Sequence, residues 1–128
     1  MRVVVEAEDY EAAVAFYRDA LGLTEEAAIA GPDDAHVTIL DAGRATLEIV
    51  NPAQKRYIDK VEVGRDVAPK LRVGFEVANS ASTTDQLVAA GAELLAPPTE
   101  TPWRSVNARL NAPADLQITL FQELDSAD

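Results

Sequence analysis

Arginine and glutamate side chains stand at alternate positions of several short, β-branched segments. Segment 2–7 carries Arg2 and Glu6 on one face, and segment 71–77 repeats the pattern with Arg72. Because successive side chains of a strand point to opposite faces, each segment has an apolar face and a mixed face. A guanidinium can bind carboxylate, phosphate or enolate oxygens. Mixed faces that converge would line a polar pocket, and the alternative is that they meet solvent.

Two further segments, 45–50 and 116–121, place Glu48 and Thr119 on mixed faces. We predict that Arg72 and Glu48 form a charge-assisted pair, because a buried glutamate without a partner is costly. The alternative is that Arg2 and Arg72 only form structural ion pairs with neighbouring glutamates.

His36 is the single histidine of the chain. A three-residue hairpin loop over 41–43 keeps Val37 opposite Leu47, so we predict this register. It sets His36 opposite Glu48 on the mixed face. An imidazole there could act as a general base, and the alternative is an ordinary strand residue.

Trp103 and Arg109 are the remaining candidates for ligand contact. Trp103 is the single tryptophan and follows a proline-rich stretch. It can stack on a flat ligand, or it can seal the core or a dimer contact. Arg109 shares a strand face with Asn107 and can reach a pocket wall, and the alternative is a solvated edge.

The elements that must position these residues follow one order twice. We expect strand 2–7, a helix capped by Asp9 and ended by Gly22, and strands 23–30, 35–40 and 45–50. The order restarts 70 residues later with strand 71–77, a helix from Asn79 or Ser80 to Gly91, and strands 92–96, 105–110 and 116–121. Segment 51–70 between them is expected to be an irregular connector with one helical turn, serving as a flap over the pocket or as a dimer arm.

The repeat predicts an α+β fold of two βαβββ modules in one domain spanning residues 1–128. Module one covers about 1–50, the connector about 51–70 and module two about 71–124. A single module cannot bury the second face of its sheet. Two modules side by side can curl a mixed sheet around a pocket.

Composition removes several classes of function. The 128 residues contain no cysteine, which excludes thiolate nucleophiles and cysteine-based metal centres. The net charge is −11, and the sequence contains no cluster of Lys and Arg. We therefore expect no nucleic-acid or membrane partner. No apolar run approaches the ~20 residues of a membrane span. We expect a cytoplasmic protein.

The order of these segments resembles the vicinal oxygen chelate superfamily, which includes glyoxalase I, bleomycin-resistance proteins and extradiol dioxygenases. The resemblance covers nearly the whole chain. The similar segments are 9–17 with Leu21-Gly22-Leu23, then 45–50, 71–77, 89–93 and 112–122. It implies paired βαβββ modules around a U-shaped pocket, commonly in a homodimer, and we therefore expect a homodimer.

The resemblance also implies four metal-ligand positions, on the first, fourth, fifth and eighth strands. They match Arg2, Glu48, Arg72 and Thr119 in this chain. Only Glu48 is a good ligand, because a guanidinium stays protonated and has no lone pair to offer. Glu48 with His36 supplies two ligands where a catalytic metal typically has three. We expect no cofactor, and a divalent metal at Glu48 and His36 is the alternative.

Three functions remain open. The first is a metal-free protein that binds or sequesters a small molecule, as the resemblance to bleomycin-resistance proteins implies. The second is an enzyme of the lyase, isomerase or dioxygenase-like kind that uses Glu48, His36 and Arg72, with or without a divalent metal. The third is an interaction module, which a pocket filled by Phe121 and Val50 would favour. The predicted ligand-contacting residues are Glu48, Arg72, His36, Thr119, Arg2, Trp103 and Arg109.

Overall fold

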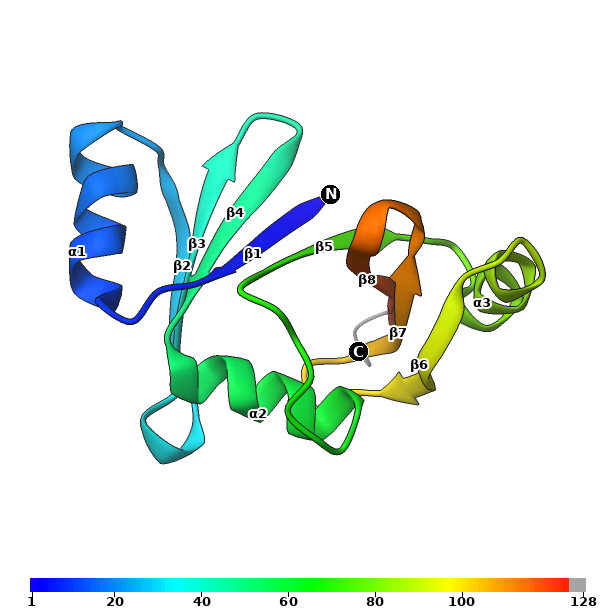
Figure 1. Cartoon of the computed structure of the whole chain (residues 1–128). Helices are drawn as coiled ribbons and strands as arrows, with labels where there is room; N and C mark the ends of the chain where they lie inside the picture. Colours follow the sequence, from blue (N-terminus) through cyan, green and yellow to red (C-terminus); the bar gives the residue numbers. More distant parts are fainter. Residues whose placement is uncertain (125–128) are drawn as a thin grey trace.

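The computed structural model describes residues 1–124. Its eight strands form one curved mixed sheet (Figure 1). The strands lie in the order β2-β3-β4-β1-β5-β8-β7-β6. Their bounds are β1 Arg2–Glu6, β2 Glu25–Ala30, β3 His36–Ala42, β4 Ala45–Val50, β5 Leu71–Glu76, β6 Glu93–Glu100, β7 Ser105–Ala112 and β8 Leu116–Glu123. Antiparallel pairing of β1 with β5 joins the two halves. The predicted α+β class and curved mixed sheet are confirmed.

Two helices cover the outer faces of the two halves (Figure 1). Helix α1 (Tyr10–Val14) continues as a π-helical segment, Ala15–Ala20, and packs Val14 against Leu40 and Ile49. The Asp9 carboxylate accepts the Ala12 N–H at 3.1 Å, which confirms the predicted cap. Helix α3 (Ser80–Ala89) packs on the second half, over a core of Ala108, Leu110, Ile118 and Leu120. The inner face of the sheet is left for a third element.

The register of the β3–β4 hairpin differs from the prediction. Ala42 pairs with Ala45, so the loop has two residues, Gly43 and Arg44, rather than three. Gly43 has φ +80°, which a two-residue turn of this kind requires at its first position. His36 consequently lies beside Asn51 and not opposite Glu48, whose partner on β3 is Ile39.

Segment 51–70 contains an eleven-residue helix, α2 (Pro52–Glu62), where the sequence predicted an irregular connector with one turn. The Asn51 carboxamide oxygen accepts the Gln54 N–H at 2.8 Å, and Pro52 occupies the first helical turn. The helix crosses the inner side of the curved sheet (Figure 1). Ile58 packs there against Val4, Val37 and Val50.

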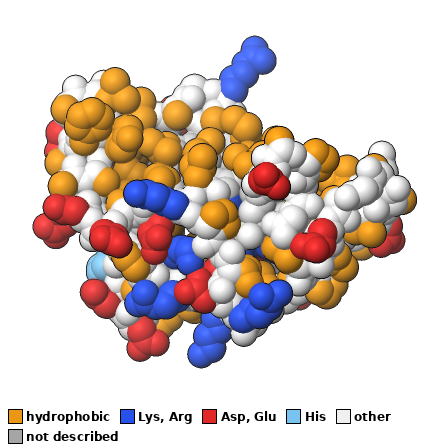
Figure 2. Space-filling model, in the orientation of Figure 1, with side chains coloured by type: hydrophobic (Ala, Val, Ile, Leu, Met, Phe, Trp, Pro, Cys, Tyr) orange, Lys and Arg blue, Asp and Glu red, His pale blue; other side chains and the backbone are white. Residues whose placement is uncertain are grey.

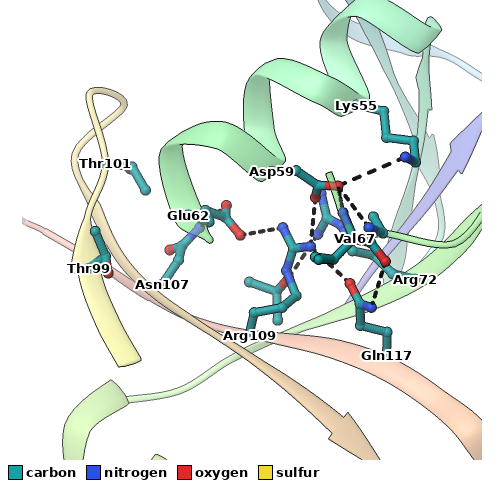
Figure 3. A network of polar contacts seen from close by, with 12 residues as sticks. Lys55, Asp59, Glu62, Val67, Arg72, Thr99, Thr101, Asn107, Arg109 and Gln117 are labelled. Atoms are coloured by element: carbon teal, nitrogen blue, oxygen red, sulfur yellow. Dashed lines mark hydrogen bonds and ion pairs between the residues drawn. The ribbon is translucent and has the colours of Figure 1, made fainter. Parts of the chain in front are cut away.

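A buried ion network fixes α2 to the second half of the sheet (Figure 3). The Arg109 guanidinium on β7 is fully buried and donates to Asp59 at 2.8 Å and to Glu62 at 2.7 Å. It also donates to the Gln117 side-chain oxygen at 2.9 Å. Both acids come from α2, one turn apart, so a single cation pairs with both carboxylates.

Asp59 also holds the chain that follows α2. Its second carboxylate oxygen accepts the backbone N–H groups of Val67 at 2.9 Å and Ala68 at 2.7 Å. Burial raises the pKa of Asp59, but the N–H of Ala68, the Arg109 guanidinium and the N–H of Val67 outweigh it and leave the pKa below its usual range. Asp59 therefore stays charged in the folded protein and orders the return of the chain to β5.

The surface in Figure 2 divides by side-chain type. Hydrophobic side chains gather over α1, and charged side chains of both signs gather over the lower part, where α2 lies. Phe16 and Leu21, at 60% and 62% exposed, are the most exposed large hydrophobic residues described. Within residues 1–124, no helix has the length and hydropathy of a membrane span.

Removal of the Arg109 guanidinium tests the network. Arg109→Met removes the cation that two buried carboxylates share and leaves Asp59 with only the longer ion pair to Lys55 at 3.9 Å, so we expect the free energy of unfolding to fall by about 3–5 kcal/mol. Urea unfolding measures the change. Arg56→Met, at an exposed position of the same helix, is the control and should stay within ~0.5 kcal/mol of wild type. Equal stability of the two variants would contradict the network's role.

Candidate binding site

A cavity of about 550 Å³ lies between α2 and the inner face of the sheet. This volume is in the range of small-molecule sites in proteins. Its walls come from both halves of the chain and from α2. Five of the seven predicted contact residues line it, namely Arg2, Glu48, Arg72, Thr119 and Trp103.

Strand pairing explains why distant residues meet at this cavity. Val4 on β1 lies opposite Glu48 on β4 and opposite Arg72 on β5. Gly74 on β5 lies opposite Arg2 and also opposite Thr119 on β8. Since these pairings have no register shift, the alternation is kept and these side chains share the inner face.

Arg72 is a buried charge of the cavity wall, at 7% exposure. Of the five N–H donors of a guanidinium, one has an acceptor among residues 1–124, the Thr119 hydroxyl at 2.9 Å. No carboxylate of that part of the chain lies within the 4.0 Å of an ion pair. Burial lowers the pKa of Arg72 and the positive charge of Arg109 adds to the effect, while the more distant charges of Glu62, Glu48 and Asp59 oppose it. A buried cation in this state has unused binding capacity toward an anion.

Glu48 lies on the other side of Val4, with 13% of its side chain exposed. Its nearest donors are Arg2 Nε and the Thr46 hydroxyl, each at 3.5 Å. Glu48 pairs with Arg2, so the predicted direct pair with Arg72 is wrong. Burial raises the pKa of Glu48, although the charges of Arg2 and Arg72 oppose the rise.

Arg2 is held by three contacts at the opening of the cavity. Its guanidinium carbon lies 3.9 Å from the centre of the Phe121 ring, and Nη2 donates to Glu123 at 2.9 Å. The Phe121 ring lies against Gly74, where an added Cβ would come within 3.4 Å of it. An alanine Cβ at Gly74 would only reach van der Waals contact with the ring, so the ring packs directly on the β5 backbone.

The apolar part of the cavity faces these charges. Tyr57 on α2 and Trp103 in the β6–β7 loop have ring centres 6.1 Å apart. Ile29, Val37 and Ile39 contribute from the first half. The cavity thus combines a charged floor with an aromatic and aliphatic wall, which is the usual composition of a site for an organic molecule.

Two predicted residues lie outside the cavity. His36 contacts Asp34 at 3.3 Å and the ring of Tyr10, because the two-residue hairpin loop moves it away from Glu48. Arg109 is neither a pocket wall nor a solvated edge, since α2 covers it and its two acids take up its charge.

The sequence reasoning missed the contribution of α2. Tyr57, Ile58 and Glu62 line the cavity from this helix. The signal was present, because Asn51 followed by Pro52 is a typical helix start. Asn107, also on the wall, donates to Glu62 at 2.8 Å.

The four positions that would hold a metal do not fit one. Arg2, Glu48, Arg72 and Thr119 do converge, but two of them are cations without a lone pair. Within the described residues, no three His, Cys, Asp or Glu side chains are grouped for metal binding. The donor set therefore favours an anion at the place where a cation would be bound.

The raised pKa of Glu48 gives a prediction for stability. Below about pH 4 the carboxyl is protonated in both the folded and the unfolded chain, and above that pH the unfolded chain loses the proton first. The free energy of unfolding of wild type should therefore fall relative to Glu48→Gln as the pH rises through the raised pKa. Urea unfolding of both proteins from about pH 4 to about pH 8 measures the difference. A difference that shrinks as pH rises would contradict the pKa direction.

Comparison with known proteins agrees with this architecture. The Glyoxalase-like domain family matches residues 2–121. A search of curated protein sequences finds no match. One similar structure is a hypothetical protein from Bacillus halodurans C-125, with 12% identity and a TM-score of 0.73, covering 99% of this chain and 95% of that one.

Two enzymes are also similar in structure. A mutant of 4-hydroxymandelate synthase from Streptomyces coelicolor has 25% identity and a TM-score of 0.70, with 99% of this chain and 39% of that one covered. Methylmalonyl-CoA epimerase from Mycobacterium tuberculosis has 18% identity and a TM-score of 0.68, with 97% and 87% covered. Because the family match spans nearly the whole chain, the protein belongs to the Glyoxalase-like domain family, within the vicinal oxygen chelate superfamily.

Proposed function

We propose that the protein binds a small organic molecule in the cavity without a metal, and that Arg72 holds an anionic group of that molecule. The observation that carries the proposal is Arg72 itself, a residue at 7% exposure whose guanidinium has one acceptor, Thr119, and no carboxylate in ion-pair range within residues 1–124. Glu62, Glu48 and Asp59 act on this charge only from beyond ion-pair range. An anion in direct contact would supply the charge-assisted hydrogen bonds that Arg72 lacks.

The remaining alternatives are weighed by the same geometry. An interaction module with a filled pocket is disfavoured, because Phe121 lines a cavity of about 550 Å³ and leaves it open. The enzyme alternative loses His36, which lies outside the cavity. It keeps Glu48, whose raised pKa suits a proton acceptor, and Arg72, which could stabilise an oxyanion. Complexes of a similar protein, methylmalonyl-CoA epimerase, with methylmalonyl-CoA make a small-molecule ligand reasonable here. A homodimer and a cytoplasmic location stay predictions.

The test compares a carboxylate with its neutral amide. We expect 3-phenylpropionate to bind wild type about tenfold more tightly than 3-phenylpropanamide, because only the acid satisfies the Arg72 charge. NMR titration or calorimetry measures both affinities. Arg72→Met should abolish the preference, and Arg72→Lys should retain part of it.

Arg56→Met, outside the cavity, is the matched control and should bind as wild type does. The fold of Arg72→Met is checked by circular dichroism, and we expect it to be retained because no ion pair is broken. Equal affinity of acid and amide for the wild type would refute Arg72 as the anchor.

A further inference from the structure

Two side chains of opposite charge flank one apolar residue on the cavity floor. Arg72 and Glu48 both lie opposite Val4, on the two strands that neighbour β1. Strands are about 4.8 Å apart, so the two backbones are separated by about 10 Å. The side chains do not meet in an ion pair, and a ligand lying over Val4 can contact both.

Glu48 has capacity for a second donor. Neither of its two donors is closer than 3.5 Å. Arg2 divides its charge, since Nη2 donates to Glu123 at the shorter distance of 2.9 Å and the guanidinium stacks on Phe121. A nearly buried carboxylate with only long contacts favours a ligand group that donates N–H bonds and carries positive charge.

The charges around the cavity favour an anionic group that is accompanied by a positive group on the same ligand. The lining contains Arg2 and Arg72 but also Glu26, Glu48 and Glu62, and the whole chain carries −11. Glu62 is paired with Arg109, whereas Glu26 and Glu48 stand on the half of the sheet away from Thr119. A molecule of zero net charge with separated charged groups avoids the repulsion of the acidic protein and matches both ends of the floor.

We propose that the ligand is an amino-acid-like zwitterion, with its carboxylate on Arg72, its protonated amine on Glu48 and an apolar, preferably aromatic, body against Ile29, Tyr57 and Trp103. This inference rests on the proposed function, since it assigns the anion at Arg72 to a carboxylate. It adds the amine and the role of Glu48.

Three probes of one skeleton separate the two contacts. Phenylalanine carries both charged groups, 3-phenylpropionate lacks the amine, and 2-phenylethylamine lacks the carboxylate. We expect phenylalanine to bind wild type about tenfold more tightly than either of the others, as measured by NMR titration at constant ionic strength.

The Glu48→Gln variant tests whether Glu48 contacts the amine of the ligand, because a purely structural role of Glu48 would change the affinity for both acids in the same direction. It should weaken phenylalanine about tenfold and leave 3-phenylpropionate equal or tighter, because it removes an attraction for the amine and a repulsion for the acid. Glu11→Gln, at an exposed position on α1, is the control and should change neither.

The outcomes distinguish this inference from the proposed function. If 3-phenylpropionate binds as tightly as phenylalanine, or if Glu48→Gln weakens both acids equally, the zwitterion is refuted and the anion site at Arg72 stands. If folded wild type binds neither acid, both proposals fail.

Discussion

The pairing of Arg109 with Asp59 and Glu62 determines the rest of this site. It fixes α2 across the inner face of the sheet and thereby closes one side of the cavity. It also engages both acids of the helix with the fully buried Arg109, at 2.8 and 2.7 Å. Arg72, close to the same network in Figure 3, is left with the Thr119 hydroxyl as its hydrogen-bond acceptor among residues 1–124. Arg72 therefore keeps N–H donors that neither acid of α2 accepts within the part of the chain that the structure describes.

The fold places these donors where they can be used. Antiparallel pairing of β1 with β5 joins two similar halves and brings their first strands to the centre of the sheet. The inner face of this junction carries Arg2, Glu48, Arg72 and Thr119. These are the four positions at which the resemblance to the vicinal oxygen chelate superfamily implies metal ligands. In this chain, the side chains of Arg2 and Arg72 supply positive charge at two of these positions.

The repeated order of strands and helices was predictable from the sequence, because alternation and helix caps are local signals. Asp9 and the mixed faces of Arg2 and Arg72 are examples that the structure confirms. The position of His36 was not predictable from the apolar pattern, because Val37 and Ile39 face the cavity and not α1, so both registers bury apolar residues. The turn chemistry of Gly43 decides the register.

The ion network was the larger omission, for a physical reason. Asp59, Glu62 and Arg109 have the composition of a solvated surface, and only their long-range pairing makes them core residues. A charged residue is buried when its partner is supplied from an element distant in sequence, here 47 positions away for Glu62 and Arg109. The start of α2 at Asn51-Pro52 was therefore predictable from the sequence, but its packing across the sheet was not.

The most direct measurement is the content of divalent metal per protomer, by elemental mass spectrometry, in protein purified without chelator and again after incubation with divalent metals. The two guanidiniums at the central positions predict a value near zero in both samples. A value near one metal per protomer would contradict the account, because a cation would then share the site with Arg72 and Arg2, and Glu48 would have to be its ligand.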